Sequence, residues 1–133
     1  MVPLTADCRE LRCSMGFCVA EGYAELGMWP EALEELGNLA AEFRAMPPVL
    51  RLELRCCVAV EAWDQGTLAA RQLRNLGIID KMMAAGFYAT LGRDLLKRGL
   101  PDEGKVALRE AIDTWPSCRE VVLRDPSLVA ALL

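Results

Sequence analysis

Residues 27–39 of the chain read GMWPEALEELGNL, and residues 61–73, which lie 34 positions later, read EAWDQGTLAARQL. The two stretches align tryptophan with tryptophan (Trp29 and Trp63), leucine with leucine, and small residues with small residues. A third copy, GLPDEGKVALREA, occupies residues 99–111 and lies 38 positions beyond the second, so about four residues are inserted between these two copies. A repeat of this length is typical of a protein built from stacked supersecondary units.

The composition of the 133-residue chain favours helices. Leucine and alanine supply 39 residues, whereas the β-branched Val, Ile and Thr together supply 16. Apolar side chains recur at spacings of three and four residues between prolines and glycines, which predicts where helices begin and end. The predicted helices run from an N-cap at Thr5 to Gly27, from Pro30 to the Pro47–Pro48 pair, from that pair to about Val60, from Asp64 to about Asn75, from Asp80 to Arg98, from Pro101 to Trp115, and over 117–124 and 126–132.

The residues at the repeated positions resemble those of the tetratricopeptide repeat family. That family uses 34-residue helix–turn–helix units, with small residues where the two helices cross and an aromatic residue in the turn. The matching residues are Ala20, Tyr23, Gly27, Trp29 and Ala32 in the first unit, and Tyr88, Leu91, Gly92, Leu95, Gly99, Gly104, Leu108, Ala111 and Pro116 in the third. The second unit departs from the pattern, because Glu53 and Leu54 stand where the family has a large apolar residue and then a small one.

The resemblance implies a fold, which we state as an expectation. It is an all-α, right-handed α-solenoid of three helix–turn–helix units (about 13–46, 47–80 and 85–118) plus a capping helix (119–133), forming one domain over residues 1–133. A solenoid must cover the apolar face of its last unit, and the apolar side chains of the C-terminal stretch are suited to this. The alternative left open is that this stretch docks onto another subunit or a partner.

Charge and histidine content exclude several function classes. The chain has 15 basic and 19 acidic residues, a net charge of −4, which disfavours a general nucleic-acid binder. It contains no histidine, the commonest general base and metal ligand. No phosphate-binding glycine loop and no nucleophile–base spacing are found. We therefore expect no enzymatic activity, no cofactor and no nucleic-acid partner.

The six cysteines and the N-terminal sequence bear on compartment. The cysteines form no C-x-x-C pair, so we expect no metal site and interpret most of them as small buried apolar residues. The first ten residues lack the layout of a secretory signal, and no apolar run is long enough to span a membrane. These features predict a cytoplasmic protein without a membrane span.

The family resemblance also implies a binding surface. In such proteins the first helix of each unit lines a concave groove that holds a partner segment. Matched by position, the candidate groove residues are Phe17, Glu21, Arg51, Arg55, Val58, Arg93, Leu96 and Lys97, with Ala24 and Ala89 beside them.

Two basic pairs stand out among these residues. Arg51 with Arg55, and Arg93 with Lys97, are spaced i,i+4, so each pair shares a helix face. Arg55 and Arg93 occupy equivalent positions of neighbouring units, which should bring them roughly 10 Å apart in a stacked array. Such a basic wall would select carboxylates, which arginine binds bidentately. The alternative is that these are solvated faces paired with nearby acidic residues, namely Glu53, Glu61 or Asp94.

The sequence therefore predicts a non-enzymatic protein–protein interaction module that binds a partner segment, possibly acidic or carboxylate-bearing, in its groove. The partner would be a protein or peptide. The alternative hypothesis is a self-associating, homo-oligomeric scaffold. It would use apolar surface left over by so short an array, or the C-terminal helix.

Overall fold

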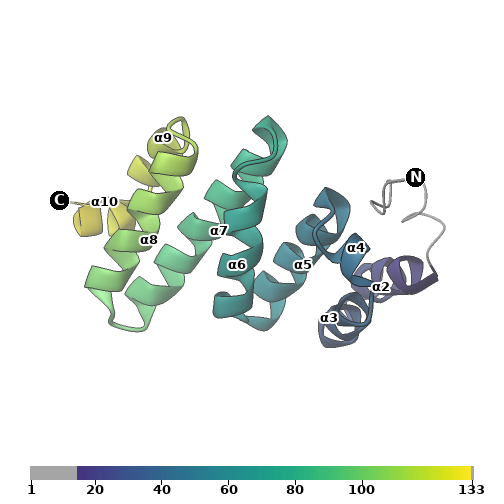
Figure 1. Ribbon diagram of the computed structural model, residues 1–133. Helices are drawn as coiled ribbons and strands as arrows, with labels where there is room; N and C mark the ends of the chain where they lie inside the picture. The colour runs from purple at the N-terminus through teal and green to yellow at the C-terminus, as the bar shows by residue number, and fades with distance from the viewer. Residues whose placement is uncertain (1–14, 133) are drawn as a thin grey trace. The chain divides into compact units, whose positions relative to one another are not determined.

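The computed structural model describes residues 15–132, and all regular secondary structure in that range is helical (Figure 1). The all-α prediction is therefore confirmed for this part of the chain, whereas the predicted N-cap at Thr5 lies outside it. The chain consists of two compact units, unit 1 (residues 1–69) and unit 2 (residues 70–133). Within residues 15–132, no helix is both long enough and apolar enough to cross a membrane.

Unit 1 contains α2 (Met15–Glu25), α3 (Trp29–Gly37), α4 (Ala41–Arg44), α5 (Pro47–Val60) and the first part of α6 (Trp63–Leu73). Prolines in the first turn begin α3 and α5, where a missing N–H costs no helical hydrogen bond. Side chains at three- and four-residue spacing from α2, α3 and α5, together with Leu39 from the loop after α3, form the core of this unit. Its buried members are Phe17, Ala20, Ala24, Ala32, Leu36, Leu39, Val49, Leu52 and Cys56.

The predicted helix from Pro30 to Pro47 is interrupted. The structure ends α3 at Gly37 and forms only the four-residue α4 before Pro47. Glycine is the weakest ordinary helix former, and the next residue, Asn38, is the C-cap, whose N–H donates to the carbonyls of Glu34 and Glu35 (both 3.2 Å). The Gly-Asn pair therefore stops the helix about nine residues earlier than the sequence analysis expected.

Unit 2 contains the end of α6, then α7 (Ile78–Lys97), α8 (Pro101–Thr114), α9 (Cys118–Leu123) and α10 (Pro126–Leu132). In Figure 1, α8 lies alongside α7, and α9 and α10 lie beside α8 at the C-terminal end. Val122 and Leu128 are buried against Leu108, with Leu96 and Cys118 packed around them. The C-terminal helices thus cover the apolar side of α8 in their own chain.

Three turns in the chain have the same backbone structure. Each has one residue with positive φ just after a helix, namely Gly27 (74°), Glu61 (60°) and Gly99 (79°). In each, the next residue donates its N–H to the carbonyl five positions back, at 2.8, 2.8 and 2.9 Å, which is the Schellman arrangement. The helix pairs α2–α3, α5–α6 and α7–α8 are therefore joined by equivalent turns, at the intervals of 34 and 38 residues that the sequence repeat predicts.

Small residues mark the place where α7 and α8 cross. A Cβ added at Gly92 would come within 2.8 Å of Leu108, and one added at Gly104 within 2.9 Å of Leu96. Each built Cβ also lies 3.2 Å from the other glycine's carbonyl oxygen, so the two backbones approach closely at this point. The residues at the equivalent positions of the first pair are Ala20 and Ala32, both fully buried.

Candidate functional site

One exposed stripe runs along α7. Ile79, Met82, Gly86, Arg93 and Lys97 are all exposed and follow one another at spacings of three, four or seven residues. The opposite face of α7 is buried through Ala84, Phe87, Tyr88, Gly92 and Leu95. Because a helix turns by about 100° per residue, this spacing places the five exposed residues on one side. We call them the α7 stripe.

The stripe changes chemistry along its length. Its N-terminal end is apolar, since Ile79 is 68% exposed and Met82 is 50% exposed. Its middle is flat, because Gly86 has no side chain and the Thr90 hydroxyl donates to the Gly86 carbonyl (2.9 Å). Its C-terminal end carries Arg93 and Lys97. The stripe therefore offers apolar contact at one end and positive charge at the other.

The apolar end coincides with the residues inserted before the third copy. At 20 residues, α7 is longer than α2 (11 residues) and α5 (14 residues), the first helices of the other two pairs as described. Together with Leu76 and Ile78, which are 50% and 67% exposed, Ile79 and Met82 form an apolar patch at its start. Exposed apolar side chains that gather in one place mark interaction surfaces more often than scattered ones do.

The two cations of the stripe are only weakly engaged within the chain. Arg93 Nε lies 3.6 Å from Asp125 Oδ2, and both side chains are more than a third exposed, so the pair contributes little to stability. Asp94 pairs instead with Arg98, one turn later, at 2.7 Å. No ion pair is found for Lys97 within the described residues. Both cations are therefore accessible to an external carboxylate.

The predicted groove residues of unit 1 lie in different environments. Phe17 is only 5% exposed and belongs to the core, because it shares the buried face of α2 with Ala20 and Ala24. Glu21 is exposed on α2. On the evidence of its burial, Phe17 is a packing residue and does not line a surface.

On α5, the two arginines are held differently. Arg55 is exposed, and its guanidinium carbon lies 5.8 Å from the centre of the Trp29 ring, a cation–π contact. Arg51 and Val58 are half-buried. Glu53, one of the acidic residues considered as an arginine partner, accepts a hydrogen bond from Gln65 Nε2 (3.2 Å).

The predicted groove residues of unit 2 also lie in two different environments. Arg93 and Lys97 lie together on the α7 stripe, one turn apart. Leu96 points away from them and packs against the cluster of Leu108, Val122 and Leu128. The sequence analysis did not single out Ile79, Met82 or Gly86. Their positions in line with Arg93, at i,i+3 and i,i+7 spacing, were the signal that could have found them.

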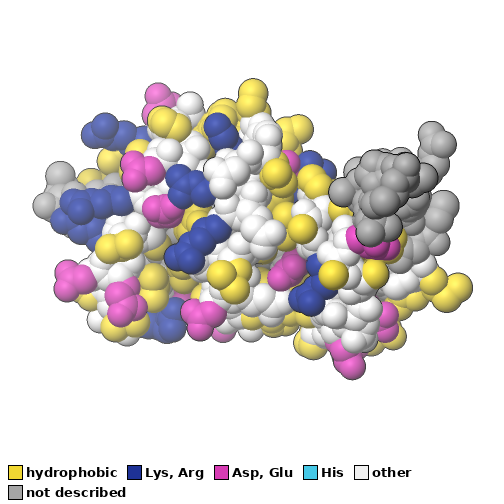
Figure 2. All heavy atoms as spheres, in the orientation of Figure 1, with side chains coloured by type: hydrophobic (Ala, Val, Ile, Leu, Met, Phe, Trp, Pro, Cys, Tyr) yellow, Lys and Arg dark blue, Asp and Glu magenta, His cyan; other side chains and the backbone are white. Residues whose placement is uncertain are grey.

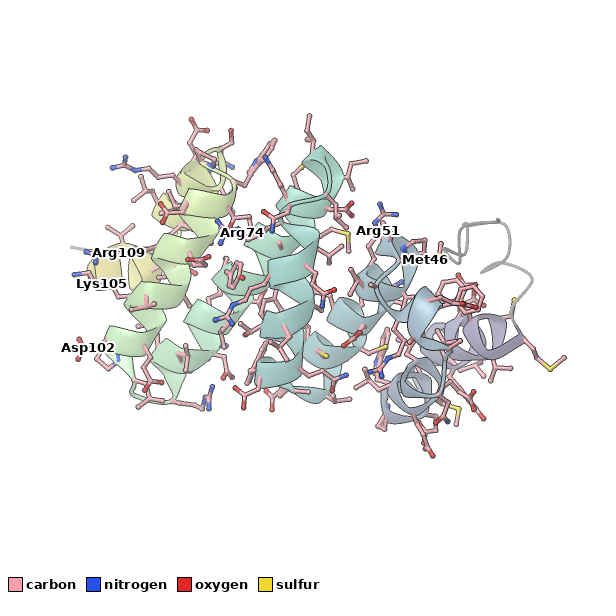
Figure 3. The ribbon with its side chains drawn as sticks, viewed as in Figure 1. Met46, Arg51, Arg74, Asp102, Lys105 and Arg109 are labelled. Carbon is pink, nitrogen blue, oxygen red and sulfur yellow. The ribbon has the colours of Figure 1, made fainter. Side chains whose placement is uncertain are left out.

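A second polar cluster lies on the other side of unit 2. Arg74, which Figure 3 shows beside α8, forms an ion pair with Glu110. The Tyr88 side chain is buried, and no well-aligned hydrogen bond to its hydroxyl is found among the described residues. Burial raises the pKa of Tyr88, against the opposing effect of the nearby Arg74 and Arg71 charges. The raised pKa keeps the enclosed phenol protonated near neutral pH, so it offers no reactive group.

Three of the described cysteines, Cys56, Cys57 and Cys118, are poor nucleophiles for the same reason. Burial raises the pKa of the Cys57 thiol to about 12, with the Glu53 charge adding to the effect, and burial also raises the pKa of Cys56 and of Cys118. No disulfide joins the four cysteines of the described range. Within residues 15–132, no group of three or more Cys, Asp or Glu side chains is placed to hold a metal ion.

Comparison of the chain with protein-family models, with curated proteins and with solved structures finds no significant match.

The repeated turns and the α7 stripe are the features that bear on function. The face of α8 shown in Figure 2 mixes basic and acidic side chains. The stripe differs from that face because its charged end carries only cations.

Proposed function

We propose that the chain is a non-enzymatic protein-interaction module of the tetratricopeptide repeat type, which binds an acidic or carboxylate-bearing segment of a partner protein. The observation that carries this proposal is the α7 stripe, which joins exposed apolar side chains to two accessible cations on a single helix face. A partner segment that lies along the stripe would place apolar side chains on Ile79 and Met82 and carboxylates on Arg93 and Lys97. Arginine and lysine would set specificity and the rate of encounter.

The repeated turns support the assignment to a helical-repeat architecture. Three helix pairs joined by the same Schellman turn, with Ala or Gly at the crossings of the first and third, are what stacked helix–turn–helix units require. In such units α2, α5 and α7 would be the first helices. Within unit 1, the predicted groove residues Glu21, Arg55 and Val58 would then lie on first helices.

The stripe sets the length of segment that fits. Ile79 and Arg93 are 14 residues apart, which is about 21 Å along a helix axis. An extended segment covers that distance in about six residues. We therefore expect ligands whose apolar residues and carboxylates are separated by about six positions.

A binding assay with synthetic peptides tests the proposal. The probes are fluorescent 12-residue peptides with two apolar residues about six positions from two glutamates, and scrambled peptides of the same composition. The wild-type chain should prefer the spaced peptides in fluorescence anisotropy. The double variant Arg93→Glu/Lys97→Glu should bind them at least about tenfold more weakly, because two attractions become repulsions.

The matched control reverses a basic pair on the second helix of the same unit. Lys105 and Arg109 are also spaced i,i+4, and Figure 3 shows them projecting from the same edge of α8. The variant Lys105→Glu/Arg109→Glu should bind the spaced peptides as the wild type does. Equal affinity for spaced and scrambled peptides, or equal losses in both double variants, would refute specific binding at the stripe.

A further inference from the structure

The helices that begin the first and third pairs carry opposite charges at equivalent positions. Glu21 and Glu25 lie six and two residues before the turn residue Gly27, and both are exposed. Arg93 and Lys97 lie six and two residues before the equivalent turn residue Gly99. Because the two turns have the same backbone structure, these residues project from corresponding faces of α2 and α7. The match depends on the turns alone and not on any placement of one unit against the other.

The same polarity holds for each unit as a whole. Residues 1–69 contain 11 acidic and 5 basic residues, whereas residues 70–133 contain 8 acidic and 10 basic residues. The net charge of −4 is therefore the sum of an acidic unit 1 and a mildly basic unit 2. Unit 1 of one molecule is electrostatically complementary to unit 2 of another, and such complementarity guides encounter and orientation.

We propose that the charged end of the α7 stripe binds a second copy of this chain, which places its α2 alongside residues 87–97 of α7 in parallel orientation. In this register Glu21 lies opposite Arg93 and Glu25 lies opposite Lys97. This proposal rests on the proposed function, because it uses the same stripe. It identifies the partner that binds there as a second copy of the chain. Each copy carries one acidic and one basic face, so the contact either closes between two copies or continues along a chain of them.

Sedimentation velocity of the full-length chain over a range of concentrations tests the proposal. The wild type should self-associate, and added salt should weaken the association through screening. Glu21→Lys/Glu25→Lys should be monomeric where the wild type is associated, because both faces would then be basic. Arg93→Glu/Lys97→Glu should be monomeric for the opposite reason. We expect each double variant to raise the dissociation constant by at least about tenfold.

Mixing the two double variants gives the decisive result. The first has two basic faces and the second has two acidic faces, so an equimolar mixture should associate although neither variant does so alone. Recovery in the mixture also shows that both variants are folded, and circular dichroism of each checks this independently. The control pairs Glu31→Lys/Glu35→Lys on α3 and Lys105→Glu/Arg109→Glu on α8 should associate as the wild type does.

Two outcomes overturn the inference: a wild type that is monomeric at all concentrations, or a mixture of folded variants that stays monomeric. The proposed function fails separately. If the chain is monomeric but still binds the spaced acidic peptides through Arg93 and Lys97, the stripe takes a foreign segment and only the self-association is refuted. If the chain self-associates but ignores those peptides, general binding of acidic segments is refuted.

Discussion

Glu61 occupies a turn position that glycine holds in the other two helix pairs. Its φ of 60° is the left-handed conformation, which costs a residue with a Cβ roughly 1–2 kcal/mol. Glu61→Gly should therefore raise the free energy of unfolding by about 1 kcal/mol, after allowance for the greater freedom of glycine in the unfolded chain. Urea unfolding followed by circular dichroism measures the change.

The reciprocal substitutions provide the control for this prediction. Gly27→Ala and Gly99→Ala should each lower the free energy of unfolding by about 1 kcal/mol, since alanine there would enter the same strained region. If Glu61→Gly destabilised the chain, interactions of the Glu61 side chain would outweigh the backbone strain.

Two glycines of α7 should respond oppositely to the same substitution. Gly92→Ala should destabilise by about 1–3 kcal/mol, because the new methyl group would lie within 2.8 Å of Leu108 and force α7 and α8 apart. Gly86→Ala should stabilise by roughly 0.5–1 kcal/mol, because that position is exposed and alanine is the better helix former. Thermal melts of both variants test the pair. Equal effects would mean that the close crossing at Gly92 is absent in solution.

At the scale of elements, the C-terminal helices should contribute to stability through one face. Val122 is 1% exposed and packs with Leu108, whereas its neighbour Val121 is 57% exposed. Val122→Ala should lower the free energy of unfolding by about 2 kcal/mol through lost burial and the cavity left behind. Val121→Ala should change it by less than about 0.5 kcal/mol. Similar values for both would show that α9 and α10 leave α8 in solution.

The sequence predicted most helices because proline and glycine mark their ends. Pro47, Pro101 and Pro126 begin α5, α8 and α10 as expected. The prediction failed where the signal was weaker. The apolar pattern continues past Gly37, and only the folded chain shows that α3 ends there with Asn38 as its C-cap. The prediction also started α7 at Asp80, although the helix begins at Ile78.

The candidate site was predictable in part. The i,i+4 spacing of Arg93 and Lys97 was enough to place them on one face, because helix geometry fixes that relation. Position within the repeat misplaced Phe17 and Leu96, since their burial depends on tertiary packing that spacing alone does not reveal. Glu21 and Glu25 correspond in position to Arg93 and Lys97 because the turns at Gly27 and Gly99 have the same backbone structure. Only the folded chain shows that equivalence.

At the scale of the whole molecule, the central claim is that the α7 stripe binds the carboxylates of a partner segment through Arg93 and Lys97. Isothermal titration calorimetry of the full-length chain with the spaced acidic peptide measures this binding most directly. The account predicts a saturable interaction that weakens with added salt, because screening shortens the reach of exposed charges, and that is lost in Arg93→Glu/Lys97→Glu. Binding of the peptide to the double variant with wild-type affinity would contradict the account.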